Sequence, residues 1–433
     1  MVIPVPDPPP VDVQRELAAM RAELASIRAR MQDGWLDESR ARDVRAIVRD
    51  ALADSATRAS LQGNDWSIGY RGGAALAAAD GSTSMNFSVL EQVRLVLSSA
   101  YGPADGTGDA NTRWGLENRR TNLTMQGTIV DPSITYLALL SYQSQSDRFV
   151  QVPDSLRPMY AQVAKDLGGG LRVVVGLQNV PWDLESDFFG SSRLTSGDYS
   201  VFNYRFGAGK QPGIAARWTG KDVRAAVGTF SQLNVRADGG WNSDEYLSFA
   251  VAGRAEAKWG ADWEQLAWMS GSRTDAPGLV LGLGLCMSNG RAQNPQPPPS
   301  SVEATPSAQG VTADARATFD GTVLIAQYAC MRDPVGAPEL GWYQGLNLQA
   351  SGFVADGVEA FVQASWMGDV PVEWFAQAGV NLFLAGPHVK LTVKAIVPFG
   401  GGDVNGIREI AGGLGVASRD NNASLVTQLQ LSY

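Results

Sequence analysis

The sequence is poor in charge, cysteine, histidine and long apolar runs, and each shortage excludes a class of protein. Only 18% of its residues are charged, against roughly 25% in ordinary soluble domains. Two cysteines cannot build a disulfide scaffold or a cysteine-rich zinc site, and a single histidine, His388, excludes a multi-histidine metal centre. No stretch approaches the roughly 18 consecutive apolar residues of a membrane-spanning helix.

Charge and motifs narrow the function further. The formal net charge of −9 argues against a nucleic-acid partner. No G-x-G-x-x-G, P-loop or G-x-S-x-G motif occurs in the chain. We therefore expect no enzymatic activity, no metal and no cofactor. Glycine is abundant, with 48 residues among 433, whereas the hydrophobic fraction is an ordinary 44%.

The first 62 residues differ in composition from the rest. Residues 1–10 hold five prolines and predict an extended leader. Residues 11–62 predict helices, and their apolar side chains repeat at heptad spacing. This seam is formed by Val13, Leu17, Met20, Leu24, Ile27 and Met31. Because only about three heptads fit, it predicts either an oligomeric coiled coil or one amphipathic helix packed on the chain.

The start of the chain carries neither the basic nor the apolar segment of a secretory signal peptide. We expect either a cytoplasmic protein or a mature chain whose signal has been removed.

From residue 63 onward, apolar and polar residues alternate. In 388–397, for example, Val389 and Leu391 alternate with Lys390 and Thr392, the pattern of strands with one apolar face. About fifteen strands are predicted, with 73–79 as a candidate sixteenth. The ranges are 84–98, 114–129, 133–146, 171–180, 212–219, 222–230, 246–259, 278–288, 317–331, 345–355, 358–367, 373–384, 388–397, 407–418 and 424–433.

A soluble sandwich and a membrane barrel both show such alternation. Two features favour an all-β transmembrane barrel of about 16 antiparallel strands over 63–433, preceded by the N-terminal α-helical coiled coil. The polar faces carry Gln, Asn, Ser and Thr rather than dense charge, and aromatic residues gather at strand ends. The chain ends on Tyr433, with Leu431 and Leu429 on the same face, which looks like the signal read by outer-membrane assembly machinery.

The order of several segments resembles a known family. The heptad helix is followed by RAIVRDALAD from Arg45, GGAALAAADG from Gly72, RWGLENRRT from Arg113 and VVVGLQNVPWDLE from Val173. This order resembles the outer-membrane porins related to phosphate-selective porins, in the subgroup with an N-terminal coiled coil. The resemblance implies a sixteen-stranded homotrimeric barrel, passive diffusion of small hydrophilic solutes or ions, and a cleaved signal peptide.

In such a pore, the residues opposite the lipid face line the interior. A charge on the lipid side would cost roughly 2–4 kcal/mol for Arg or Lys, so strand parity predicts an inward position for most strand charges. These predicted pore-lining residues are Arg94, Arg120, Arg172, Arg224, Arg254, Lys258, Lys390, Lys394, Glu359 and Glu373. They predict a basic interior, but the dense arginine ladder of phosphate-selective members is missing. Weak anion preference and non-selective diffusion both remain open.

Two further segments have candidate roles. Residues 182–198 join two strands and predict an inward constriction loop carrying Asp183, Glu185, Asp187 and Arg193, or else an ordinary external loop. Residues 291–310, rich in Pro, Gln and Ser, predict an external loop. Cys286 and Cys330 flank that loop, and a disulfide and two unpaired thiols are both consistent with their positions.

We therefore predict an integral protein of the bacterial outer membrane with its N-terminal helix in the periplasm. The expected partners are outer-membrane lipid and lipopolysaccharide, sister subunits, and peptidoglycan or a periplasmic protein bound by the coiled coil. A structural anchor with a plugged or narrow pore is the main alternative. A barrel phospholipase and a soluble all-β binding protein are further ones.

Overall fold

The computed structural model describes residues 66–70, 73–100, 113–143, 155–231, 233, 249–272, 276–289, 307–332, 342–368, 373–399 and 422–433. The predicted leader and heptad helix lie outside these residues. No helix among the described residues is both long and apolar enough to cross a membrane.

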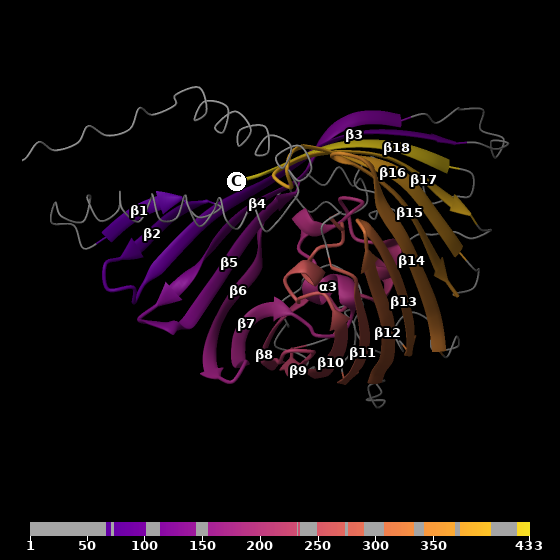
Figure 1. Cartoon of the computed structure of the whole chain (residues 1–433). Coiled ribbons are helices and arrows are strands. Elements are labelled where there is room, and N and C mark those ends of the chain that lie inside the picture. The colour runs from indigo at the N-terminus through magenta and orange to yellow at the C-terminus, as the bar shows by residue number, and fades with distance from the viewer. Residues whose placement is uncertain are drawn as a thin grey trace, which may run out of the picture.

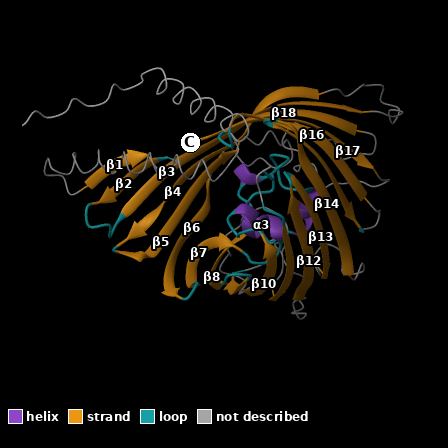
Figure 2. Ribbon diagram, in the orientation of Figure 1, coloured by secondary structure: helices purple, strands orange, loops and turns teal. Residues whose placement is uncertain are grey.

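A single antiparallel sheet of 18 strands makes up the fold, and 16 of its strands close into a ring (Figures 1 and 2). Every ring strand pairs with the next one along the chain, and the last strand pairs with the first, from Ser432 opposite Leu90 to Asn422 opposite Ala100. The ring strands are β3 (Ser84–Ala100), β4 (Arg113–Ile129), β5 (Asp131–Gln143), β6 (Ser155–Gly168), β7 (Leu171–Asn179), β8 (Lys210–Thr219), β9 (Val223–Phe230), β10 (Phe249–Gly260), β11 (Gly278–Asn289), β12 (Ser307–Phe319), β13 (Thr322–Arg332), β14 (Trp342–Ala355), β15 (Val358–Met367), β16 (Glu373–Ala385), β17 (Val389–Phe399) and β18 (Asn422–Ser432).

The other two strands form a hairpin at the rim. Strands β1 (Trp66–Tyr70) and β2 (Ala74–Ala78) pair with each other, and β2 pairs with Ser84–Phe87 at the start of β3. Strand β18 occupies the same side of β3 from Leu90 onward, so β2 continues the line of β18 beyond the C-terminus. The candidate sixteenth strand at 73–79 is therefore a strand, but it lies outside the closed ring.

The two ends of the ring differ in how strands are joined. At one end, here the short-turn end, six connections are very short: Val130, 169–170, 220–222, 320–321, 356–357 and 386–388. The seventh, residues 261–277 between β10 and β11, is much longer. At the opposite, long-connection end, β7 and β8 are joined by residues 180–209.

Alternation along the strands separates an apolar outside from a polar interior. On β11, Leu281, Leu283 and Leu285 are exposed on the outer face, whereas Val280 and Cys286 are buried on the inner face. The inner face of the whole ring, here called the lumen side, holds most of the buried polar and charged side chains. The predicted pattern of one apolar and one polar face per strand is confirmed.

Several predicted boundaries were wrong. The range 317–331 contains the last three residues of β12 and most of β13, separated by a turn at Asp320 and Gly321. Strand β6 was not predicted, and β12 begins at Ser307, inside the range predicted to be an external loop. The predicted strand at 407–418 lies outside the described residues.

The two cysteines are free, so the disulfide interpretation is wrong for this structure. Cys286 lies on the inner face of β11, whereas Cys330 lies on the outer face of β13, two strands away. The wall of the barrel separates the two sulfur atoms.

Gly176 on β7 lies where the wall leaves no room for a side chain. Gly176 has φ +120°, and a Cβ there would lie 2.1 Å from the backbone oxygen of Ala161 on β6. We expect Gly176→Ala to lower the free energy of unfolding by about 1–3 kcal/mol, because both the backbone conformation and the contact disfavour a side chain. Denaturant unfolding in detergent measures this effect. Gly190→Ala is the control, because its φ is not positive and a Cβ there meets nothing within 4 Å; equal effects would contradict the prediction.

Candidate functional site

The connection between β7 and β8 folds into the barrel instead of away from it (Figures 1 and 2). It contains helix α3 (Leu184–Phe188), a 3₁₀ turn η1 (Ser191–Arg193) and helix α4 (Val201–Phe206). Asp183 and Ser200 cap the two helices, accepting hydrogen bonds from the backbone N–H groups of Ser186 and Asn203. Residues 180–209 are called the inner loop below. Most of residues 182–198 are buried inside the ring.

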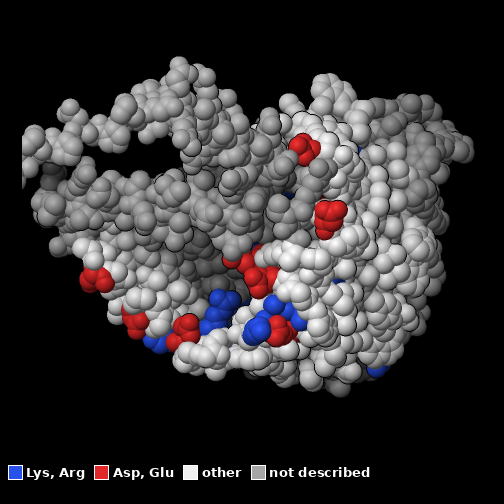
Figure 3. Space-filling view, viewed as in Figure 1, with Lys and Arg blue, Asp and Glu red and all other residues white. Residues whose placement is uncertain are grey.

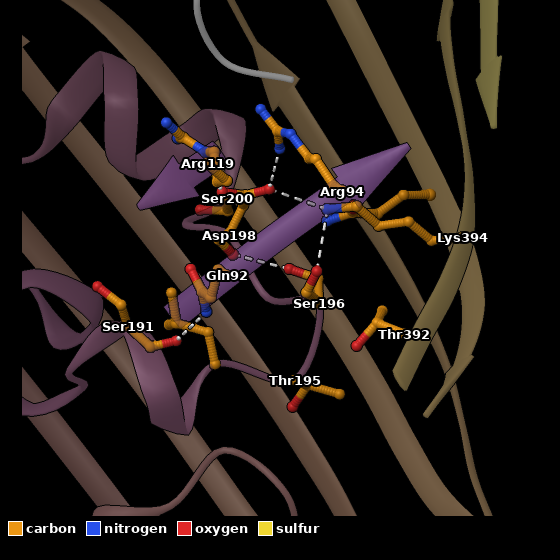
Figure 4. Close-up of polar contacts among 12 residues, drawn as sticks. Gln92, Arg94, Arg119, Ser191, Thr195, Ser196, Asp198, Ser200, Thr392 and Lys394 are labelled. Carbon is orange, nitrogen blue, oxygen red and sulfur yellow. Dashed lines mark hydrogen bonds and ion pairs between the residues drawn. The ribbon is translucent and has the colours of Figure 1, made fainter. Parts of the chain in front are cut away.

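Asp198 ties the inner loop to the wall formed by β3, β4 and β17 (Figure 4). Its carboxylate lies 2.8 Å from Nη1 of Arg94, 2.9 Å from Nε of Arg119 and 3.4 Å from Nζ of Lys394. Arg120 Nη2 is a fourth cation, 3.9 Å from the same carboxylate. Burial alone would raise the pKa of Asp198, but the four cations, Arg119 and Arg94 foremost, hold the pKa of that carboxyl well below its usual range. The aspartate therefore stays ionised and neutralises part of a dense cationic cluster.

Side-chain amide and ammonium groups of the wall hold residues 194–196, which precede Asp198 in the inner loop. Lys390 Nζ donates to the backbone oxygen of Leu194 at 2.7 Å, and Lys394 Nζ donates to that of Ser196 at 2.9 Å. Asn381 on β16 donates to the backbone oxygen of Thr195 at 2.9 Å. The carbonyl groups of this irregular segment are thus satisfied by the wall rather than by water.

Glu185 is buried against a row of amides instead of a cation. Its carboxylate accepts hydrogen bonds from Gln327 at 2.8 Å, from Asn347 at 3.3 Å and from the backbone N–H of Ser200 at 2.8 Å. Burial is the largest influence and raises the pKa of Glu185 to about 7. This carboxyl therefore changes charge near neutral pH.

Apolar clusters fill the part of the lumen beside β9–β16. Trp182, Phe202 and Phe206 of the inner loop pack against Met331, Tyr343 and further side chains of the wall. Leu184, Phe189 and Leu194 form a second cluster with Met269, Val323 and Ile325. Because these side chains are almost fully buried, this part of the cross-section is closed to water.

A cavity of about 270 Å³ remains between the inner loop and strands β3–β6. Arg120 and Lys210 line it together with the hydroxyl groups of Ser191, Tyr160 and Tyr199, and no Asp or Glu side chain lines it. Lys210 Nζ lies 5.1 Å from the ring centre of Tyr160. Figure 3 shows basic side chains gathered with carboxylates in the hollow of this view. Apolar side chains such as Leu90, Leu139 and Met159 also line the cavity, so it is a mixed space that carries two cations.

A second basic pair lies on β7 and β8. Arg172 and Arg217 face each other across these strands. Arg217 Nη1 lies 2.8 Å from a carboxylate oxygen of Asp187 in the inner loop. Arg172 itself is exposed. The wall from β4 to β8 therefore presents several cations to the lumen, only part of which are matched by the acids of the inner loop.

The structure places the predicted site residues as follows. Arg94, Arg120, Arg254, Lys258, Lys390, Lys394 and Glu359 are buried on the lumen side, Arg172 and Arg224 are less buried, and the side chain of Glu373 lies outside those described. Most of these charges are already paired: Arg254 with Asp314 and Glu256, and Arg224 with Glu256. Of the predicted loop acids, Asp187 meets a wall arginine, whereas Asp183 caps a helix and Glu185 meets amides.

Sequence reasoning missed several residues that matter to the site. Asp198 stood at the end of the predicted loop but received no role, and Lys210 and Arg217 on β8 were not counted as lining residues. Strand parity could have found Arg217, because it is directly opposite Arg172. The partners of Asp198 come from three strands far apart in the sequence, and no local signal relates them.

The remaining predicted features have clear positions. Leu429 and Tyr433 are exposed on the outer side of the last strand, and Leu431 pairs with Glu91 of β3. His388 lies at the rim, where Nδ1 is 3.0 Å from the backbone oxygen of Ser432. Among the residues that the structure describes, no cluster of three or more His, Cys, Asp or Glu could hold a metal ion.

Removing the charge of Asp198 should release the inner loop. In Asp198→Asn, Arg94, Arg119 and Lys394 lose their shared counter-ion, and breaking such a buried pair costs roughly 3–5 kcal/mol. We expect cleavage within 180–209 by an added protease to become at least several-fold faster, as measured by mass spectrometry of the fragments. Asp131→Asn is the control, because Asp131 forms an exposed pair with Lys165. Equal cleavage in the two variants would contradict the assignment.

The raised pKa of Glu185 makes the stability of the fold depend on pH. Its carboxyl is protonated in the folded protein up to about pH 7 but ionises near 4.5 in the unfolded chain. Its contribution is therefore fully present below 4.5 and is lost as the pH rises through about 7. We expect the thermal midpoint to fall over this range, and Glu185→Gln to flatten the fall. A fall of the same size in both proteins would show that other groups cause it.

Comparison with known proteins agrees on the fold. No family model matches the sequence, and no curated protein matches it. Among solved structures, the anion-selective porin from Comamonas acidovorans is similar with a TM-score of 0.54 and 13% identity, over 81% of this chain and 100% of that one. OmpF of Salmonella typhi, solved in complex with daunomycin, is similar with a TM-score of 0.54 and 10% identity, over 81% of this chain and 98% of that one. OmpT of Vibrio cholerae, an outer membrane protein in its trimer form, is similar with a TM-score of 0.51 and 10% identity, over 81% of this chain and 100% of that one. The chain has the fold of these 16-stranded barrels.

Proposed function

We propose that this protein is an outer-membrane porin that allows passive diffusion of small hydrophilic solutes and ions. Three observations support the proposal: the closed ring leaves no open sheet edge between β3 and β18, its outer face is apolar, and its lumen is polar and narrowed by an inner loop. A closed barrel with an apolar exterior is the form in which strands can cross a bilayer. Outer-membrane lipid and lipopolysaccharide are then the environment of the outer face.

The route of diffusion follows the cavity beside β3–β6. Apolar clusters close the part of the lumen beside β9–β16, whereas Arg120, Lys210 and hydroxyl groups line the open space. This cavity, with two cations and no Asp or Glu side chain, is the observation that carries the proposal. An anion in it meets a lower electrostatic barrier than a cation, so we propose a weak anion preference.

The topology also suggests an orientation and an assembly. Strand β1 lies at the short-turn end, and residues 1–65 precede it. In our proposal this end faces the periplasm, where a coiled coil at 11–62 joins three subunits and contacts peptidoglycan or a periplasmic protein. The C-terminal residues Leu429, Leu431 and Tyr433 serve as the assembly signal. Relation to the phosphate-selective subgroup rests on the order of sequence segments alone.

Ion selectivity tests the role of the cavity. In planar bilayers under a salt gradient, we expect the wild type to show open steps and a reversal potential on the anion side. Lys210→Glu should move the reversal potential toward cations, because two units of charge change beside the route. Lys165→Glu makes the same change on an exposed side chain at the short-turn end of β6 and should move it little.

Two outcomes would count against the proposal. A clear cation preference of the wild type would remove the anion preference while leaving diffusion intact. Absence of open steps, in a protein that migrates as a heat-modifiable folded barrel, would favour a structural anchor with a plugged lumen.

A further inference from the structure

The long connection at the short-turn end enters the barrel from the side opposite the inner loop. Residues 261–277 join β10 to β11, and the structure describes 261–272 and 276–277 of this connection. Residues 261–272, called the lower segment below, contain a 3₁₀ turn η2 (Gln265–Ala267). Leu266 and Met269 are 3% and 2% exposed, so this part of the segment is packed inside the barrel, whereas Asp262 and Glu264 are exposed.

Arg193 joins the lower segment to the inner loop. Its Nη1 donates to the backbone oxygen of Ala267 at 3.4 Å, and its guanidinium carbon lies 5.1 Å from the ring centre of Trp268. The backbone oxygen of Arg193 accepts a hydrogen bond from the N–H of Met269 at 3.3 Å. Two segments that start from opposite ends of the barrel therefore meet in its interior.

The wall fixes the lower segment by polar contacts. Arg316 on β12 donates hydrogen bonds to the backbone oxygens of both Leu266 and Trp268. Ser270 donates to a carboxylate oxygen of Glu359 on β15 at 2.8 Å. A guanidinium that holds two carbonyl groups is a rigid clamp, because its N–H groups have a fixed geometry.

The same segment completes an apolar layer across the lumen. Met269 packs with Phe189 and Leu194 of the inner loop and with Val323 and Ile325 of β13. All five side chains are at most 2% exposed. An apolar layer of this kind excludes water and therefore ions. Met269 is the side chain that the lower segment contributes to this layer.

We propose that the lower segment is a second constriction of the pore, which seals the lumen beside β12–β15 from the short-turn end. The inner loop alone would narrow the pore from one end, whereas the two segments together confine diffusion to the side of β3–β8. The size limit for solutes is then set jointly by the inner loop and the lower segment. This inference goes beyond the proposed diffusion. It rests on the proposed function only because its test measures conductance through the pore.

The test shortens the connection. Residues 261–277 are replaced by Asp-Gly, the two residues that join β12 to β13 in this chain at Asp320 and Gly321. We expect single-channel conductance in planar bilayers to rise about twofold or more, because the apolar layer loses its central side chain. The largest polyethylene glycol that lowers the conductance should also increase in size.

A milder pair of variants guards against misfolding. Met269→Ser removes the apolar contact, and Arg193→Ala removes the link between the two segments; each should raise conductance less than the shortened variant does. Leu283→Ala, on the outer face of β11, is the control and should leave conductance unchanged. Heat-modifiable migration on gels confirms that each barrel is folded before its conductance is compared.

The outcomes separate this inference from the proposed function. Unchanged conductance and polymer size limit in all three lumen variants, in folded barrels, would overturn the second constriction while leaving the porin intact. A wild type without open steps, together with a shortened variant that conducts, would support the constriction but overturn diffusion through the native protein. Folded barrels that never conduct would overturn both.

Discussion

The arrangement of the interior depends on one ionic cluster. Asp198 lies within 3.4 Å of Arg94, Arg119 and Lys394, which come from β3, β4 and β17. An unpaired arginine or lysine in such a buried position would be costly, and an isolated aspartate equally so. Because each side supplies what the other lacks, the inner loop is held inside the ring. The same inner loop carries Trp182, Phe189 and Phe206, whose apolar clusters fill part of the lumen.

The chemistry of the lumen is unequal around the ring. Beside β13–β16, amides such as Gln327, Asn347 and Asn381 satisfy the polar groups of the inner loop directly. Beside β3–β8, Arg120 and Lys210 share a cavity that no Asp or Glu side chain lines. Amides hold a segment without adding charge, whereas cations repel one another and attract mobile anions. The same loop can therefore be fixed on one side and border a charged passage on the other.

Much of this architecture could be predicted from the residues. Period-two alternation located most ring strands, and parity correctly assigned Arg94, Arg254 and Lys394 to the inner face. Parity could not show that most of these charges are neutralised by partners, because Arg254 and Asp314 lie on strands that come together only in the sheet. The predicted strand 317–331 ran from the end of β12 into β13, since Asp320 and Gly321 make a turn too short to interrupt the alternation clearly.

The sequence by itself determined most of the strands and their two faces, since alternation depends on neighbours along the chain and a strand shows its two faces in about ten residues. It also indicated 182–198 as a candidate inward loop, because this segment joins two predicted strands and carries several acids among Gly and Ser. Only the tertiary structure decided where the ring closes, that β1 and β2 remain outside it, and that a second segment with Met269 meets the first inside. These outcomes depend on contacts such as Arg193 with Ala267, or Lys394 with Ser196, whose partners are brought together by closure of the ring.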